Sequence, residues 1–245
     1  MKDSLFEIID NKKIAKNTYE MHLMGDTSHI TASGQFVNIK IDGFFLRRPI
    51  SVCNVEGGEL TIIYKVVGKG TEAMAEMKAG VELLILTGLG NGYNTALSGD
   101  APLLVGGGAG VPPMFYLGRK LISEGKKPRA ILGFGSSDEV FYKEEFEKIG
   151  IPVTVTTVDG SEGVKGFVTD AMADIDYTYF YTCGPEPMLK AIYTKSETSG
   201  QFSFEERMGC GFGACMGCSC KTLTGNKRIC KEGPVLMKEE ILWEK

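Results

Sequence analysis

The stretch Met208–Cys230, MGCGFGACMGCSCKTLTGNKRIC, contains five of the seven cysteines of this chain. Four of them follow the spacing C-x4-C-x2-C-x11-C, namely Cys210, Cys215, Cys218 and Cys230. Three close thiolates and a distant fourth are the pattern of a plant-type [2Fe–2S] cluster. The glycines between the cysteines allow the backbone to wrap closely around two irons and to point N–H groups at sulfur. The stretch therefore predicts a cluster site, and it organises the interpretation of the remaining chain.

The same cysteines allow three simpler interpretations. A zinc knuckle usually pairs two C-x2-C units, whereas here one C-x4-C-x2-C group meets a single distant cysteine. A disulfide requires an oxidising compartment, and a cysteine-rich core needs no metal at all. Cys220 could replace Cys218 as the third ligand, but the spacing favours Cys218. Cys220 is then expected to be a small packed residue.

The composition is that of an ordinary globular protein. Of its residues, 43% are hydrophobic and 24% are charged. The length of 245 residues is enough for two medium-sized domains and a small additional subdomain. Its net charge of −4 gives no reason to expect a nucleic-acid partner. No apolar run reaches the roughly 18 residues of a membrane span, and the N-terminus lacks the apolar core of a signal peptide. We therefore expect a cytoplasmic protein without membrane contact, in which His22 and His29 are strand or loop residues.

Residues 1–98 alternate in short apolar runs separated by turn signals, which predicts a small antiparallel barrel. The expected strands are Leu5–Ile9, Tyr19–Met24, Gln35–Ile41, Leu60–Val67 and Val81–Leu86. A short helix over Thr71–Met77, with Thr71 as its N-cap, is expected between the last two.

Two segments of this barrel have the chemistry of anion sites. Arg47-Arg48-Pro49-Ile50-Ser51 presents a guanidinium beside a rigid proline, and its fork matches a phosphate. Gly68-Lys69-Gly70-Thr71 is a glycine-rich turn opening a helix, where free N–H groups can bind an anion. Either segment alone is as often an ordinary surface turn.

Residues 99–200 change to strands that alternate with helices, which predicts an open parallel sheet. The expected strands are Leu103–Gly106, Arg129–Phe134, Val153–Val158 and Tyr177–Thr182, and the expected helices are Met114–Glu124, Glu139–Ile149 and Met188–Ser196. After the first strand comes a glycine-rich turn whose N–H groups can approach a pyrophosphate: Gly106, Gly107, Gly108, Ala109 and Gly110. The absence of a basic cluster in Phe134–Ser137 favours NAD over NADP without deciding between them.

The order R-x-x-S, strand, G-x-G-T resembles the flavin domain of the ferredoxin–NADP reductase superfamily. That resemblance implies FAD contacts at Arg48, Pro49, Ile50, Ser51, Ile63, Tyr64, Lys65, Gly70 and Thr71. It places Cys183, Gly184 and Pro185, in the segment CGPEPM, near the nicotinamide. Lys65 stands where relatives often carry arginine, and Lys69 where they often carry an acidic residue, so the roles of both lysines stay open.

With the cysteine-rich tail included, the chain resembles the electron-transfer subunits of dihydroorotate dehydrogenase B along essentially its full length. The fold class implied is α/β plus β: an antiparallel flavin-binding barrel (1–98), a parallel-sheet nucleotide-binding domain (99–200) and a small C-terminal [2Fe–2S] subdomain (201–245). The implied partner is a catalytic, FMN-containing dihydroorotate dehydrogenase subunit, in a heterotetramer with two of each subunit. The implied cofactors are FAD, a [2Fe–2S] cluster and NAD, and no catalytic acid or base is expected in this chain.

Two other functions fit parts of the same pattern. An NAD(P)H-oxidising subunit of a hydrogenase or bifurcating transhydrogenase would have a related architecture, although such relatives often replace one cluster cysteine by aspartate. A zinc-stabilised structural module would leave RRPIS and GGGAG without a purpose.

Overall fold

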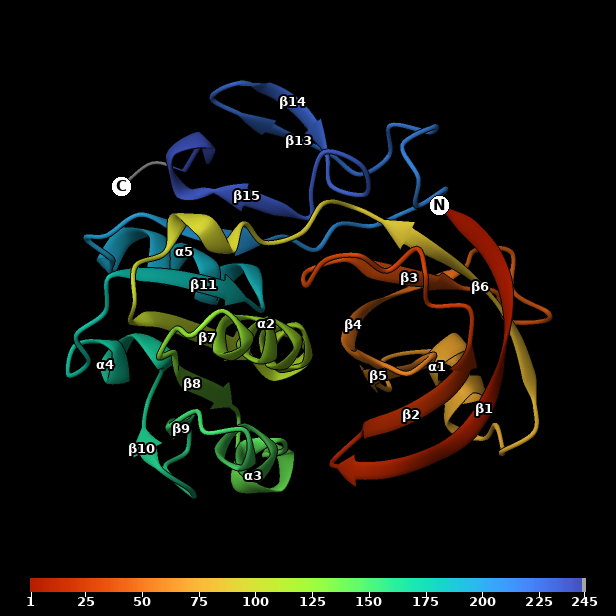
Figure 1. The fold of residues 1–245 in the computed structure, drawn as a ribbon, viewed down its shortest axis with the longest axis horizontal. Coiled ribbons are helices and arrows are strands. Elements are labelled where there is room, and N and C mark those ends of the chain that lie inside the picture. The colour runs from red at the N-terminus through yellow and green to blue at the C-terminus, as the bar shows by residue number, and fades with distance from the viewer. Residues whose placement is uncertain (244–245) are drawn as a thin grey trace.

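The computed structural model describes residues 1–243, and these form a closed barrel, a seven-stranded sheet and a cysteine-rich segment (Figure 1). The barrel strands, in hydrogen-bonded order, are β1 (Lys2–Ala15), β2 (Thr18–Gly25), β5 (Glu59–Lys65), β4 (Arg48–Glu56), β3 (Phe36–Ile39) and β6 (Glu82–Leu89). All neighbours pair antiparallel, as the turn signals in the first hundred residues predict. The last two residues of the predicted third domain, 244 and 245, lie outside the described part of the chain.

The barrel is closed around an apolar interior. Phe6, Ile8, Leu23, Ile62 and Ile85 are fully buried there, each on a strand whose alternate residues face outward. Period-two alternation places one face of every strand in the core, which fixes the register of each pair. The barrel is therefore specified locally by its own strands.

Two elements of the barrel differ from the sequence prediction. Arg48–Ser51, expected as a turn, begin strand β4 and pair in register with β3. Pro49 is tolerated there because it stands at the start of the strand, where its missing N–H interrupts the ladder least. Helix α1 (Lys69–Ala75) begins two residues before the predicted N-cap. Thr71 Oγ1 instead accepts the N–H groups of Val67 (3.0 Å) and Gly68 (3.3 Å), which orders the turn from inside the helix.

The second unit is an α/β sheet in the order β10-β9-β8-β7-β11-β12-β15. Its strands are β7 (Pro102–Gly107), β8 (Arg129–Phe134), β9 (Val153–Thr157), β10 (Val164–Lys165), β11 (Tyr179–Cys183), β12 (Gly200–Ser203) and β15 (Val235–Met237). All pairs are parallel except β12 with β15. Its helices are α2 (Val111–Ser123), α3 (Lys143–Lys148), α4 (Val168–Met172) and α5 (Glu186–Lys195).

The strand order reverses beside β7. The chain first adds β8, β9 and β10 on one side of β7, and then places β11 on its other side. Such a switch point is where open α/β sheets bind ligands, at the carboxyl ends of the strands. The predicted helix Glu139–Ile149 is shorter than expected, because Tyr142 adopts a left-handed conformation (φ 67°) that a helix cannot include.

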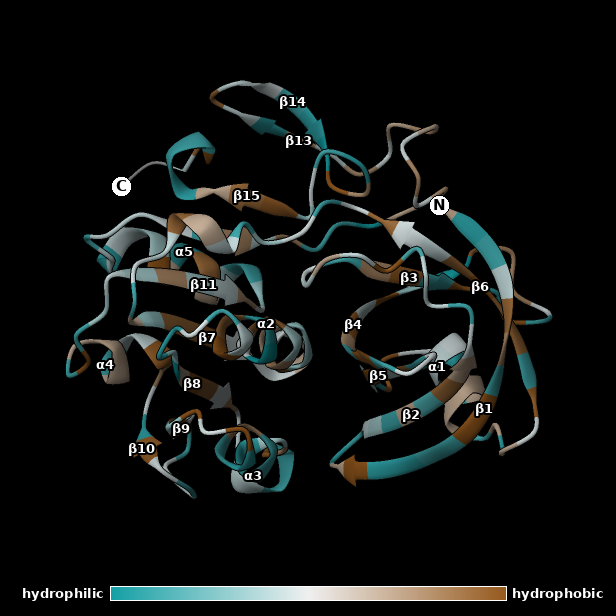
Figure 2. Cartoon of the chain, in the orientation of Figure 1, coloured by the Kyte–Doolittle hydropathy of each residue, from teal (hydrophilic) through white to brown (hydrophobic). Residues whose placement is uncertain are grey.

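The cysteine-rich segment crosses back over both units. It contains the hairpin β13 (Ser219–Thr222) and β14 (Gly225–Arg228), which is largely hydrophilic, and then returns to the sheet through the apolar strand β15 (Figure 2). The addition of β12 and β15 to the nucleotide sheet was not predicted. No helix in residues 1–243 is long and apolar enough to cross a membrane.

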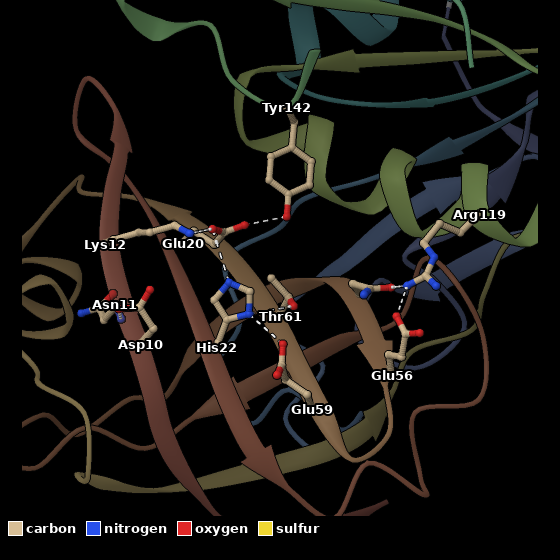
Figure 3. Close-up of polar contacts among 11 residues, drawn as sticks. Asp10, Asn11, Lys12, Glu20, His22, Glu56, Glu59, Thr61, Arg119 and Tyr142 are labelled. Carbon is tan, nitrogen blue, oxygen red and sulfur yellow. Dashed lines mark hydrogen bonds and ion pairs between the residues drawn. The ribbon is translucent and has the colours of Figure 1, made fainter. Parts of the chain in front are cut away.

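The barrel and the sheet are joined by a network of side chains around Glu20, a barrel residue that is 7% exposed (Figure 3). Tyr142, which precedes α3, donates its hydroxyl to Glu20 Oε1 at 2.7 Å. Lys12 Nζ and His22 Nε2 lie 2.9 and 3.3 Å from Glu20 Oε2. Burial alone would raise the pKa of Glu20, but bonds from His22, Tyr142 and Lys12 lower it to about 2. Glu20 is therefore an anion at neutral pH, and it links the two units.

Candidate functional site

The glycine-rich turn Gly106–Gly110 and the segment Cys183–Pro185, both predicted to bind the nucleotide, lie side by side at the switch point. Gly106, at the end of β7, is opposite Cys183, at the end of β11. A Cβ on Gly110 would lie 2.0 Å from the carbonyl oxygen of Cys183, so only glycine permits this approach. A Cβ on Gly107 would lie 2.5 Å from Met188 Sδ in the first turn of α5. The parallel register thus brings together segments that are more than 70 residues apart in sequence.

The predicted flavin motifs are also brought together. The guanidinium of Arg48 covers Gly70, where a Cβ would lie 2.1 Å from Arg48 Nε. The same guanidinium lies 4.8 Å from the ring centre of Phe44 and donates to the carbonyl of Leu46. A half-buried cation therefore rests on a backbone without a side chain, and such a cradle fits a pyrophosphate oxygen pair.

The barrel faces the nucleotide loop across a small cavity. Ile63, Tyr64 and Lys65 of β5 line one side of it, and Gly108 and Ala109 line the other. The predicted FAD-contacting and NAD-contacting segments are therefore neighbours, as transfer between a flavin and a nicotinamide requires.

Two of the β5 residues in this cavity already have partners in the protein. Tyr64 is 2% exposed, and its hydroxyl donates to Asn11 Oδ1 at 3.0 Å. Lys65 Nζ is 3.1 Å from Glu139 Oε1, an ion pair between the barrel and the nucleotide sheet.

The cysteine loop directs backbone amides at sulfur. The N–H groups of Ala214 and Cys215 donate to Cys210 Sγ at 3.2 and 3.4 Å, and that of Cys210 donates to Cys215 Sγ at 3.5 Å. Burial opposes ionisation of Cys210, but these and neighbouring amides lower its pKa to about 6. Hydrogen bonds to cluster sulfurs are one way in which proteins stabilise charged iron–sulfur centres. The donor set of this loop therefore fits thiolate ligands.

The other two predicted ligands form a second pair. Cys218 and Cys230 are each 2% exposed, and the N–H of Cys230 donates to Cys218 Sγ at 3.4 Å. Burial, together with the neighbouring Cys218, raises the pKa of Cys230 to about 12. Among the described residues, no three His, Cys, Asp or Glu side chains converge on one metal position. The pairs Cys210–Cys215 and Cys218–Cys230 match the two thiolates that each iron of a [2Fe–2S] cluster takes.

The remaining cysteines lie apart from these pairs. Cys220 is half-buried on β13, and burial raises its pKa. Cys53 and Cys183 are fully enclosed in the core between the barrel and the sheet, and burial raises the pKa of both thiols. None of the seven cysteines forms a disulfide bond.

Two further residues shape the site: Asn91, in a stretch expected to close the barrel domain beside the flavin, and Glu205, which the sequence interpretation did not single out. Asn91, in the segment LGNGY, donates to the carbonyls of Glu232 (3.1 Å) and Val235 (2.7 Å) and accepts from the N–H of Val235 (2.9 Å). It therefore attaches the end of the cysteine segment to the barrel–sheet linker. Glu205 lines a cavity of about 330 Å³ beside Gly184 and Pro185, where burial raises its pKa. Its only sequence signal is its position in SFEERM, directly before the cysteines.

The fold and these sites define an oxidoreductase of the ferredoxin reductase type that uses FAD, NAD and a [2Fe–2S] cluster. Two family models match: residues 205–242 match the iron–sulfur cluster binding domain of dihydroorotate dehydrogenase B, and residues 104–194 match the oxidoreductase NAD-binding domain. A solved structure of NADH-dependent reduced ferredoxin-NADP oxidoreductase is similar with a TM-score of 0.88 and 29% identity, over 97% of this chain and 90% of that one. The FAD- and NADP-bound ferredoxin NADP+ reductase of Neisseria gonorrhoeae shares the fold (TM-score 0.68, 16% identity, 80% and 90% covered).

Two curated relatives are similar along nearly their whole length. Each is named as a dihydroorotate dehydrogenase B (NAD(+)) electron transfer subunit. The protein from Shouchella clausii is 40% identical, with 98% of each chain covered, and that from Fusobacterium nucleatum is 44% identical, with 95% of each covered. The chain belongs to the family of dihydroorotate dehydrogenase B electron transfer subunits.

Proposed function

We propose that this chain carries electrons from a separate catalytic subunit, which oxidises dihydroorotate on FMN, to NAD+. The bound groups supply the redox chemistry: an iron–sulfur centre moves single electrons, a nicotinamide accepts a hydride, and a flavin mediates between the two. The observation that carries the proposal is the presence of two amide-supported cysteine pairs in the same chain as the paired Gly110 and Cys183 loops.

The residues of the chain then act by binding and orientation. Arg48 and the Gly70–Thr71 turn would hold the FAD pyrophosphate, with Pro49, Ile50 and Ser51 along the same strand. Ile63, Tyr64 and Lys65 would line the flavin on the neighbouring strand β5. No side chain of this chain is assigned an acid or base role.

The nucleotide would lie at the switch point of the sheet. The backbone of Gly106, Gly107, Gly108, Ala109 and Gly110 would approach its pyrophosphate, and Cys183, Gly184 and Pro185 would border its nicotinamide. Asp138 and Glu139, which follow β8, place carboxylates where a 2′-phosphate would add negative charge, and this favours NAD over NADP.

Cys210, Cys215, Cys218 and Cys230 are proposed as the cluster ligands. Phe212 and Met216 project from the loop between them and are 43% and 55% exposed, so this loop offers an apolar surface for the catalytic subunit. We propose an assembly with two copies of each subunit, in keeping with the family. The three cysteines outside this ligand set, Cys53, Cys183 and Cys220, are unpaired, which supports a cytoplasmic location because reducing compartments keep thiols unpaired.

The three-part division into 1–98, 99–200 and 201–245 is proposed as the functional organisation, one part for each cofactor. Strands β12 and β15 attach the last part to the nucleotide sheet. The alternative subunit of a hydrogenase or bifurcating transhydrogenase is disfavoured by the relatives of 40–44% identity, which carry the dihydroorotate dehydrogenase name over nearly full length.

The proposal is tested by the visible spectrum of the anaerobically purified protein before and after addition of NADH. Flavin and [2Fe–2S] bands that both bleach are expected, together with co-purification of an FMN-containing partner active on dihydroorotate. A colourless protein with one zinc per chain would contradict the redox function. Flavin bands without cluster bands would contradict the assignment of the four cysteines alone.

A further inference from the structure

The cysteine loop contacts the barrel at one buried polar side chain, that of Asn38. Asn38 is on β3 and is 1% exposed. Its strand neighbours Val37 and Ile39 face the barrel interior, so Asn38 points to the outer face together with Phe36. Phe36 there belongs to the same apolar cluster as Cys218 and Cys230. An amide in such a face needs an explanation, because burying it is unfavourable unless it is hydrogen-bonded.

The amide of Asn38 reaches the first predicted cluster ligand. Its Nδ2 donates to the backbone carbonyl of Cys210 at 3.5 Å. The next residue, Gly211, has φ +78°, and a Cβ on it would lie 2.4 Å from Asn38 Nδ2. The loop therefore approaches Asn38 more closely than any residue other than glycine would permit. Among residues 1–243, Asn38 Oδ1 is buried without a hydrogen-bond partner.

Asn38 also adjoins the predicted flavin strand. It is opposite Pro49 on β4, directly after Arg48, and neighbouring strands are about 4.8 Å apart. Its backbone carbonyl accepts from Arg47 Nη1 at 3.3 Å, and Arg47 is paired with Asp3 at 2.6 Å. One residue thus touches the cysteine loop with its side chain and the flavin-binding segment with its backbone.

We propose that Asn38 is a positioning residue that sets the geometry of the cluster loop relative to the flavin strand. Its bond to the Cys210 carbonyl fixes the start of the loop, from which the N–H groups of Ala214 and Cys215 reach Cys210 Sγ. A leucine would suit the surrounding apolar face better, so we assign the asparagine to this contact, which it makes at the expense of an unpaired oxygen. The inference rests on the proposed function, because it assumes that the four cysteines hold the cluster.

Two substitutions in the cofactor-loaded chain test the inference. Asn38→Leu removes the donor and the unpaired oxygen, and Asn38→Asp keeps the shape but replaces the donor by a carboxylate. Thr156→Val is the matched control, since Thr156 Oγ1 is also buried without a partner, but on β9 of the nucleotide sheet. The measurements are stopped-flow reduction by NADH, followed separately at flavin and cluster wavelengths, and the EPR spectrum and iron content of the cluster after reduction with dithionite.

We expect NADH to reduce the flavin of every variant at the parent rate. In both Asn38 variants, cluster reduction slows or iron retention falls by about 10-fold, in the range typical for residues that support metal ligands, and the EPR spectrum shifts. The control should match the parent in all measurements. An unchanged EPR spectrum, iron content and cluster rate in the Asn38 variants would overturn the inference, and Asn38→Asp decides alone if the leucine variant does not fold.

Failure of the proposed function would give a different result. In that case the parent flavin itself would not respond to NADH. The EPR spectrum and iron content after dithionite would still decide whether Asn38 supports the cluster, because neither depends on NADH.

Discussion

The barrel and the cysteine loop represent two opposite ways of holding a cofactor. The barrel closes by strand pairing around residues such as Phe6, Ile62 and Ile85, and its interior is complete without any bound group. The loop from Met208 to Cys218 contains no strand or helix, and its N–H groups point at sulfur rather than at carbonyls. A segment of this kind derives its stability from metal binding, whereas the barrel derives it from burial. The comparison predicts that the two regions respond to different perturbations.

Loss of a cluster ligand is expected to have the largest effect and to be confined to the loop. Cys218→Ser should abolish the cluster absorption and reduce the iron content to background, while FAD binding and the far-UV circular dichroism are retained. Cys220→Ser is the matched control and should keep full iron, because Cys218 and not Cys220 is the predicted ligand. Iron content of the anaerobically purified variants provides the measurement. A cluster that survives Cys218→Ser but not Cys220→Ser would reverse the ligand assignment.

Acid should weaken the junction between the barrel and the sheet, because that junction is built around the Glu20 carboxylate. The cysteine loop takes no part in this junction. The pKa of Glu20 is lowered from 4.5 to about 2, so the stabilisation is present above pH 4.5 and is lost as the pH falls toward 2. One pKa unit corresponds to about 1.4 kcal/mol, so the lost stability is about 3 kcal/mol. The free energy of urea unfolding, followed against pH in parent and Glu20→Gln, measures this effect. An equally steep acid dependence in Glu20→Gln would exclude Glu20 as its source.

His22 contributes with the opposite sign. Its bond with Glu20 raises its pKa above 6.5, and burial opposes that rise. Its contribution is therefore present below pH 6.5 and is lost as the pH rises through the raised value. The same unfolding series, extended to alkaline pH, should show a decline in the parent that is absent in His22→Gln.

A smaller effect is expected within the flavin site. Gly70→Ala places a methyl group where Arg48 now lies, so the guanidinium must move away from the backbone turn. We expect FAD affinity to fall by about 10-fold, or about 1.4 kcal/mol, with little change in folding stability. Gly68→Ala is the control, because a Cβ at Gly68 meets nothing within 4 Å. Fluorescence titration of each apoprotein with FAD gives the affinities of Gly70→Ala and Gly68→Ala. Equal affinities would show that the position of Arg48 beside Gly70 does not matter for FAD binding.

The smallest effect is expected at the partly exposed contact between α2 and β4. Arg119 Nη1 donates to Asn54 Oδ1 at 2.6 Å and lies 2.9 Å from Glu56 Oε2 (Figure 3). Arg119→Ala should lower the free energy of unfolding by only about 0.5–1 kcal/mol, as exposed pairs usually do, and should leave the iron content unchanged. A loss of cluster in this variant would show that the two regions are coupled, contrary to the comparison.

Local patterns in the sequence determined the elements and the chemistry of the motifs. The strand Arg129–Phe134 has the predicted bounds, because a short apolar run between turn signals leaves few alternatives. The thiol spacing predicted the iron–sulfur cluster, and the glycine runs predicted anion sites, since close backbone approach leaves a mark in composition. The assignment of FAD rested on the family resemblance. The predictions failed at Tyr142, whose positive φ shortens a helix with a regular amphipathic pattern.

Only the tertiary structure decided which of these segments meet. Asn38 and Cys210, or Glu20 and Tyr142, are more than 100 residues apart, and neither pair leaves a periodic signal in the chain. Strands β12 and β15 join the sheet because β11 offers an open edge, a fact that neither segment contains by itself. The sequence therefore determined which groups can bind flavin, nucleotide and iron. Their order in space followed from long-range strand pairing, which depends on the whole fold.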